Sequence, residues 1–271
     1  MFYFVLFLIF IFGTVIGSFL NCLIWRLHEK KTILGRSFCL KCKKQIAWYD
    51  NIPILSFIIL KGKCRHCGKK ILWQYPVVEL AAGILFVIAF LVNQESGIRN
   101  QELFILNFSL IPDSLFFIHL IRDWFIISVM IIIFIYDLRW YLILDIITLP
   151  ACLIVFIFNL LLGANWQNFL ISGIIGGSFF LLQFVISRGK WIGGGDIRLG
   201  LLMGLALGWP MILTALYIAY ILGSIVGIYL LATKKKALSG KIPFGVFLST
   251  ATVITLFWGG ALVEWYWGIF I

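Results

Sequence analysis

Four acidic side chains stand where long apolar runs of this chain begin or end. Asp137, Asp145 and Asp196 lie at the ends of such runs, and Glu79 lies at the start of another. An ionisable group at membrane depth is costly, so it indicates a functional site by default. Two aspartates that come together can share one proton, because like charges cannot both ionise at close range. Such a pair could activate water and polarise a carbonyl group, which is the chemistry of peptide hydrolysis.

The segment WIGGGDIRL, residues 191–199, sets Asp196 directly after three glycines. Glycines let backbone, water or a bound peptide come close to a neighbouring carboxylate. This segment could therefore form half of an aspartyl protease site. A second interpretation stays open, in which Asp196 caps a short helix beginning at Ile197 and accepts hydrogen bonds from its free N–H groups.

Other hydrolytic chemistries lack the residues they need. His28 and His66 belong to a basic loop, and His119 falls on the opposite side of the predicted membrane, so no histidine is available beside a buried serine or cysteine. The chain contains no H-E-x-x-H motif, which excludes a metalloprotease of that type. A pair of aspartates is the simplest remaining choice.

Two C-x-x-C pairs form a second candidate site. They are CLKC, from Cys39 to Cys42, and CRHC, from Cys64 to Cys67, with 21 residues between them. This spacing approximates a site in which four thiolates bind one zinc ion, and such a site is structural because no ligand position stays open to water. A reducing compartment disfavours the rival disulfides. We expect His66 to be solvated rather than a ligand.

The composition defines the class of protein that must position these residues. The mean hydropathy is +1.07, only 12% of residues are charged, and apolar runs of membrane-spanning length recur along the chain. We therefore predict an all-α polytopic membrane protein with about eight transmembrane helices and a small cytoplasmic zinc-binding loop domain. The predicted spans are 2–26, 77–93, 121–137, 144–163, 168–187, 197–209, 211–232 and 244–270.

The basic residues indicate the orientation of these spans. Of the 22 lysines and arginines, 12 lie between Arg26 and Lys70, and most others lie in short connections. Such an excess marks the cytoplasmic side, so we interpret the net charge of +11 as membrane topology rather than nucleic-acid binding. The same rule favours two spans separated at Gly208–Pro210 over one long helix. It places both termini outside, with 94–120 as the main external loop.

Glycines four residues apart predict where helices pack closely in the membrane. These glycines are Gly13 and Gly17, Gly173 and Gly177, Gly200 with Gly204 and Gly208, and Gly223 with Gly227.

Several segments together resemble one family, the bacterial type IV prepilin peptidases, which are G-x-G-D intramembrane aspartyl proteases. The similar segments run in order over most of the chain: GSFLNCLIWRL (17–27), WYDNIPILSFIILKGKCRHCGKKI (48–71), YPVVEL (75–80), YDLRWYLILDIITLP (136–150) and GGGDIRL (193–199). Three positions depart from the usual family pattern, because Leu40 and Leu144 replace prolines and Arg198 replaces a lysine.

This resemblance implies a role for each candidate residue. Asp137 and Asp196 are implied to be the catalytic pair, and Asp145 a second acid outside it. Cys39, Cys42, Cys64 and Cys67 are implied to bind zinc. The implied domains are a first transmembrane helix (1–27), a cytoplasmic four-cysteine domain (28–75) and a membrane-embedded protease domain (76–271).

The resemblance also implies a reaction and its partners. Family members cleave a short basic leader from prepilins or pseudopilins at the cytoplasmic face of the bacterial inner membrane. Many then methylate the new N-terminus with S-adenosylmethionine. No dinucleotide-type glycine motif marks a site for this cofactor, and Asn21 and Glu79 are candidates only by position. Membrane lipids are expected partners, and nucleic acid is not.

Two other functions remain as alternatives. A proton-coupled transporter could also use paired aspartates, although it would place them near the middle of the bilayer. A non-catalytic assembly protein could carry the same zinc module, but it would not need both Asp137 and Asp196.

Overall fold

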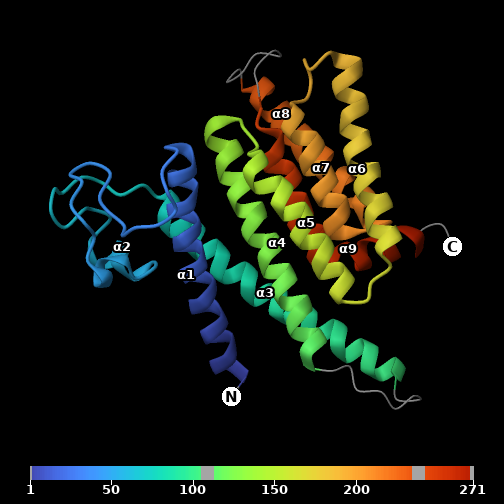
Figure 1. Ribbon diagram of the computed structural model, residues 1–271, viewed down its shortest axis with the longest axis horizontal. Coiled ribbons are helices and arrows are strands. Elements are labelled where there is room, and N and C mark those ends of the chain that lie inside the picture. The colour runs from blue at the N-terminus through green and yellow to red at the C-terminus, as the bar shows by residue number, and fades with distance from the viewer. Residues whose placement is uncertain (1, 105–112, 234–241, 269–271) are drawn as a thin grey trace. The chain divides into compact units, whose positions relative to one another are not determined.

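The computed structural model describes residues 2–104, 113–233 and 242–268, and their regular elements are helices (Figure 1). The described residues also form two isolated β-bridges, which do not extend into strands. The predicted all-α class is therefore confirmed. The helices are α1 (Phe2–His28), η1 (Trp48–Asn51), α2 (Leu55–Ile59), α3 (Gln74–Phe104), α4 (Asp113–Trp140), α5 (Asp145–Leu161), α6 (Trp166–Ser187), α7 (Gly194–Leu207), α8 (Met211–Ala232) and α9 (Phe244–Gly268).

Each of the eight predicted spans corresponds to one of these helices. Among the described residues, six helices are long and apolar enough to cross a membrane, namely α1, α3, α4, α6, α8 and α9. The other two are shorter, with 17 residues in α5 and 14 in α7. At about 1.5 Å per residue, α7 is about 21 Å long, which is less than the roughly 30 Å of a hydrocarbon core. The predicted break at Gly208–Pro210 is confirmed, because α7 ends at Leu207 and α8 begins at Met211.

The segment 94–120, predicted to be the main external loop, is helical at residues 94–104 and 113–120. Helix α3 continues to Phe104, and α4 begins at Asp113. Hydropathy had located only the apolar part of each helix, and a helix can continue past that part into polar sequence. Asp123 is buried within α4, where it pairs with Arg122 at 2.9 Å.

The chain divides into two compact units, residues 1–92 and 93–271. In the first unit α1 packs directly against α3. A Cβ on Gly13 would lie 2.8 Å from the carbonyl oxygen of Ala82, and one on Gly17 would lie 2.8 Å from the Cα of Glu79. The predicted close packing at these two glycines is confirmed, because only glycine leaves room for the neighbouring backbone.

In the second unit α7 is the central helix, with contacts to α5, α6, α8 and α9. Its core residues Leu199, Leu202 and Met203 are fully buried. Helix α6 packs closest, because Cβ atoms on Gly200 and Gly204 would collide with the backbone of α6.

The remaining glycine predictions have mixed outcomes. Gly173 and Gly177 of α6 both face α7. A Cβ on Gly173 would lie 3.0 Å from the Cγ of Leu205, and a Cβ on Gly177 would lie 3.6 Å from the carbonyl oxygen of Ile197. Gly208 instead ends α7 with a φ of +74°, a conformation that favours glycine. In α8, a Cβ on Gly223 would lie 3.5 Å from the rings of Phe244 and Phe247 of α9, an ordinary contact. A Cβ on Gly227 would come no closer than 4.0 Å to any described residue, so the predicted close packing is not seen there.

Candidate active site and metal cluster

Asp137 lies one turn before the end of α4 and is buried. Its Oδ2 accepts a hydrogen bond of 3.2 Å from the backbone N–H of Val246, in the first turn of α9. The first N–H groups of a helix lack partners within the helix and carry positive partial charge. The start of α9 therefore positions this carboxylate.

Asp196 is the third residue of α7 and is also buried. Its Oδ2 accepts a hydrogen bond of 3.0 Å from the backbone N–H of Gly193. The carboxylate therefore does cap the start of a helix, as the second interpretation of the sequence proposed, although α7 begins at Gly194 rather than at Ile197. Capping fixes the position of the group and does not prevent it from reacting.

One side chain, Ile143, packs against two glycines that adjoin the aspartates, Gly195 beside Asp196 and Gly245 beside Asp137. A Cβ on Gly195, the residue before Asp196, would lie 2.8 Å from the Cβ of Ile143. A Cβ on Gly245 would lie 3.1 Å from the Cδ1 of Ile143 and 2.9 Å from the Oδ2 of Asp137. The absence of side chains at these two glycines lets α7, α9 and Ile143 meet beside the carboxylates.

The two carboxylates are close enough to interact electrostatically. Asp196 also interacts in this way with Tyr220 of α8. The Tyr220 hydroxyl donates a hydrogen bond of 2.9 Å to the Oε1 of Gln183, and its ring packs edge-on against Phe244, with centroids 5.2 Å apart. The chain thus brings together two acids that are 59 positions apart in sequence.

Asp145 has different surroundings from these two aspartates. It is the first residue of α5, its side chain is about half exposed, and it forms an ion pair with Arg198 of α7. Leu144 caps α5 with a φ of −84°, close to the value that a proline would impose. The departure from proline therefore leaves the local backbone in a proline-like conformation.

The exposed backbone beside Asp196 gives a peptide room to approach. Gly193 and Gly194 are exposed, and a Cβ on Gly194 would meet no atom within 4 Å. Two buried carboxylates, one beside this open backbone, could divide the roles of base and acid in hydrolysis.

The four cysteines of the first unit form one cluster that could hold a metal ion. Their sulfur atoms all lie within 4.8 Å of one another, and those of Cys39 and Cys67 are 3.9 Å apart. A zinc ion bound to four thiolates at about 2.3 Å would place the sulfur atoms roughly 3.8 Å apart, so these residues fit zinc. His66 is exposed and is not part of the cluster.

The two C-x-x-C pairs are held by the same local structure. The N–H of Cys39 donates to the carbonyl oxygen of Lys44, and the N–H of Cys64 donates to that of Lys69, each at 2.9 Å. Flanking β-bridges join Phe38 to Gln45 and Lys63 to Lys70. Each pair therefore sits in its own tight turn, with both thiols directed to one side.

A bidentate ion pair supports the second turn. The guanidinium of Arg65 donates to both carboxylate oxygens of Asp50, with contacts of 2.6 to 3.1 Å. The hydrogen bonds and the charge of Arg65 hold the pKa of Asp50 below its usual range. Arg26 fixes the other end of the loop by donating to the carbonyl oxygens of Ile33 and Gly35.

The two cofactor candidates suggested by position have different roles. The amide of Asn21 donates to the carbonyl oxygen of Tyr75 and accepts from Gln74, which joins α1 to α3. Glu79 accepts a hydrogen bond of 2.8 Å from the backbone N–H of Ile54 rather than pairing with a lysine. Glu79 also lines a cavity of about 430 Å³ within the first unit, and Asn21 does not.

Sequence reasoning missed Ile143, Tyr220 and Gly245. The segment IPFG at 242–245 carried one usable signal, since a proline before a helix start is common and a glycine in the first turn leaves that turn open. No pattern within the sequence indicated that this turn would meet Asp137, which is 109 positions away.

Comparisons with known proteins identify similar sequences over most of the chain. Residues 11–93 match the bacterial peptidase A24 N-terminal domain, and residues 124–228 match the type IV leader peptidase family. The chain is similar to the prepilin leader peptidase/N-methyltransferases of Aeromonas salmonicida, with 30% identity over 96% of this chain and 92% of that one, and of Bacillus subtilis, with 28% identity over 96% of both. The Vibrio cholerae protein of the same name is 32% identical over 73% of this chain and 76% of its own. No solved structure matches the chain.

Proposed function

The chain belongs to the type IV leader peptidase family, and from this premise we propose that it is a prepilin leader peptidase whose catalytic pair is Asp137 and Asp196. The observation that carries the proposal is that two buried carboxylates, each held by a backbone N–H near the start of a helix, lie on segments that pack against the same side chain, Ile143. The alternative acid Asp145 is half exposed and already paired with Arg198.

In the proposed mechanism one aspartate is ionised and the other is protonated. One carboxylate takes a proton from water as the water oxygen attacks the scissile carbonyl carbon. The other carboxyl group donates its proton to the carbonyl oxygen, and the leaving amine is protonated when the C–N bond breaks. The open backbone at Gly193 and Gly194 lets an extended peptide lie beside Asp196.

The rival functions explain less of this geometry. Asp137 lies three residues before the end of α4 and Asp196 in the first turn of α7, whereas transporters hold their coupling residues near the middle of the bilayer. A purely structural assembly protein has no need for two buried carboxylates that meet.

We propose that the same chain also methylates the new N-terminus with S-adenosylmethionine. The cavity of about 430 Å³ in the first unit falls within the size range of small-molecule sites, and Ser18, Trp25, Tyr75 and Glu79 contribute to its lining. When bound, S-adenosylmethionine would supply an electrophilic methyl group. The lining offers the carboxylate of Glu79 to the sulfonium of this ligand and basic side chains such as Arg26 and Lys44 to its carboxylate, and the aromatic rings would exclude water.

Zinc is the metal proposed for Cys39, Cys42, Cys64 and Cys67, with a structural role. Burial raises the pKa of the Cys39 thiol, but hydrogen bonds from the backbone of Cys42 and Lys41 and from neighbouring thiols outweigh it and lower this pKa to about 7. A hydrogen bond from the backbone of Lys69 lowers the pKa of the Cys67 thiol, but burial and the neighbouring thiols outweigh it and raise this pKa to about 11. The cluster therefore loses its first proton more readily at Cys39 than at Cys67.

The proposed location is the bacterial inner membrane, with the active site facing the cytoplasm. This orientation rests on the basic connections, because the catalytic ends of α4 and α7 lie beside Arg139, Lys190 and Arg198. The three proposed domains remain 1–27, 28–75 and 76–271.

The proposed substrates are prepilins or pseudopilins with a short basic leader. The loop between α1 and α3 is itself strongly basic, so attraction of the leader to this loop is not what recruits the substrate. Recruitment would come from packing of the substrate's apolar helix against the membrane helices.

Incubation of the purified protein with a model prepilin tests the proposal. Mass spectrometry should show loss of the leader, and methylation of the new N-terminus only when S-adenosylmethionine is added. A substrate that stays intact under conditions in which the protein is folded and loaded with zinc would contradict the peptidase assignment. A cleaved but unmethylated product would contradict only the second activity.

A further inference from the structure

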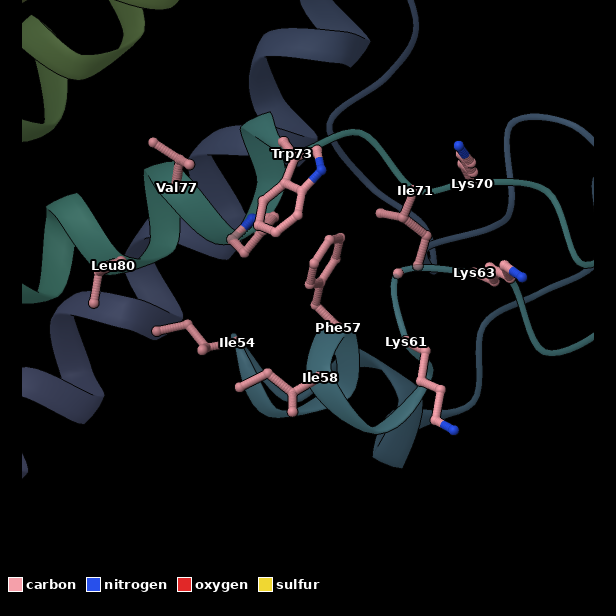
Figure 2. Close-up of a pocket in the computed structure, with 12 residues that line it drawn as sticks. Ile54, Phe57, Ile58, Lys61, Lys63, Lys70, Ile71, Trp73, Val77 and Leu80 are labelled. Carbon is pink, nitrogen blue, oxygen red and sulfur yellow. The ribbon is translucent and has the colours of Figure 1, made fainter.

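A second cavity of the first unit, of about 560 Å³, lies between α2 and the start of α3 and shares Ile54, Phe57, Lys70 and Ile71 with the lining of the cavity proposed for S-adenosylmethionine. Figure 2 shows its two contrasting ends. Lys61, Lys63 and Lys70 stand at one end, and Val77 and Leu80 of α3 stand at the other. We call this cavity the lysine groove.

Aromatic and aliphatic side chains connect these two ends. The rings of Phe57 and Trp73 pack at a centroid distance of 5.0 Å in the middle of the groove. Ile58 and Trp73 remain 64% and 73% exposed, although both are large and apolar. Apolar groups this exposed, beside the start of a membrane-spanning helix, indicate contact with the membrane interface, where tryptophan is enriched.

The three lysines have no acidic partner among the described residues of the first unit. The three carboxylates of this unit belong to Glu29, Asp50 and Glu79. Asp50 is paired with Arg65, and Glu79 accepts from the N–H of Ile54. The β-bridge between Lys63 and Lys70 brings two of the positive charges next to each other. This end of the groove therefore attracts a negatively charged group.

The apolar end continues directly into a membrane-spanning helix. Val77, Leu80 and Ile84 occupy one exposed face of α3, at the spacing of successive helical turns. The opposite face, with Val78 and Ala82, is buried. An apolar chain that leaves the groove can therefore follow the lipid-facing side of α3.

We propose that the lysine groove binds an anionic phospholipid, with the headgroup phosphate at Lys61, Lys63 and Lys70 and an acyl chain along Val77 and Leu80. Basic clusters at the cytoplasmic end of a transmembrane helix attract anionic headgroups, and snorkelling lysines reach the headgroup level. A basic peptide, such as the leader of the proposed substrate, carries the wrong charge for this end of the groove.

Native mass spectrometry of the full chain in a non-ionic detergent tests this proposal, with phosphatidylglycerol and phosphatidylcholine of identical acyl chains as probes. The wild type should retain phosphatidylglycerol in preference to phosphatidylcholine. The triple variant Lys61→Gln, Lys63→Gln, Lys70→Gln should weaken this retention by at least about tenfold. Soluble glycerol phosphate, which has no acyl chain, should not displace the lipid.

The matched control is the triple variant Lys41→Gln, Lys43→Gln, Lys44→Gln. It removes the same charge from the first cysteine turn, outside the lysine groove, and should bind phosphatidylglycerol like the wild type. Equal losses in the two triple variants would mean that overall charge attracts the lipid, which would overturn the proposal. Equal binding of both lipids by the wild type would overturn it as well.

A measurement on the wild type keeps the test decisive if the groove variant loses zinc or fails to fold. Phosphatidylglycerol with a photoactivatable acyl chain should label peptides that contain residues 54–63 or 70–80. Labelling confined to other parts of the chain would contradict the proposal. Displacement of the lipid by a model prepilin would assign the groove to the substrate instead, and prepilin cleavage can be scored separately in each variant.

Discussion

At the residue scale, both candidate aspartates are held by backbone N–H groups near the start of a helix. Asp137 reaches the first turn of α9, and Asp196 reaches back to Gly193. The residue types and the glycines around Asp196 made the acids predictable from the sequence. The role of Gly245 was not predictable, because it depends on the close approach of the Asp137 carboxylate, which belongs to a helix distant in sequence.

Neighbouring glycines give a matched test of the packing around Asp196. In Gly195→Ala the new Cβ would lie 2.8 Å from the Cβ of Ile143, so the start of α7 must shift. Misplacement of a catalytic group by about 1 Å can lower a rate by roughly 10²-fold, and we expect a loss of this order in prepilin cleavage. Gly194→Ala should keep its fold and lose less activity, because its Cβ would meet no atom of the protein within 4 Å and would obstruct only the approaching peptide, an effect seen as a raised KM. Equal rates in the two variants would contradict this account of the site.

At the element scale, the short helix α7 determines where Asp196 lies. The distribution of basic residues and the sequence Gly208–Pro210 predicted that this helix is short and separate from the next one. The structure confirms both points. The partners of α7 did not follow from the sequence. Glycine spacing predicted close packing on α1, α6, α7 and α8 alike, but Cβ atoms on the α8 glycines would lie only at ordinary contact distances from the described residues. Glycines four residues apart allow a second helix to pack closely against the first, but the tertiary fold determines whether a second helix lies there.

The α6–α7 contact predicts a large effect of one methyl group on stability. A Cβ in Gly204→Ala would collide with the carbonyl group of Ser172, which cannot move without displacing α6. We expect a loss of about 1–3 kcal/mol, the usual effect of overpacking, visible as a lower midpoint of thermal unfolding in detergent. Gly227→Ala on α8 is the control, since its nearest neighbour would be 4.0 Å away. Unchanged midpoints in both variants would show that the two helices separate freely.

The loop between α1 and α3 contains only the short helices η1 and α2, so we expect it to depend on its metal. Cys39→Ser should lower the zinc content from one ion per chain and expose the loop to proteases, while the helical circular dichroism persists. Cys22→Ser should keep its zinc, because Cys22 does not belong to the cluster. Full zinc content in Cys39→Ser would rule out this four-thiolate site.

At the scale of the whole molecule, composition and charge placement predicted most of the architecture. The class, the order of the helices and their approximate bounds follow from apolar length. Residues 94–104 and 113–120 were assigned to a loop because polar residues interrupt the hydropathy there, although the helices continue through them. How segments such as 136–145, 193–196 and 242–246 converge is a property of tertiary packing that no local pattern contains.

The predicted orientation can be tested at the two ends of one helix. Lys190→Cys follows α6, and Gln167→Cys lies in its first turn, and both positions are exposed. A membrane-impermeant maleimide applied to intact spheroplasts should label Gln167→Cys but not Lys190→Cys, with the wild type as background. Permeabilisation should expose the second site. The reverse pattern would place the proposed active site on the outer face.

The most direct test of the central claim is prepilin cleavage by Asp137→Asn and Asp196→Asn, compared with Asp145→Asn. Asparagine keeps an oxygen that can accept the N–H of Val246 or Gly193, so fold, zinc content and thermal midpoint should persist. We predict that each of the first two variants loses at least roughly 10²–10⁴-fold in rate, the usual contribution of a general acid or base, whereas Asp145→Asn still cleaves. Cleavage near the wild-type rate by either Asp137→Asn or Asp196→Asn would contradict the proposed catalytic pair.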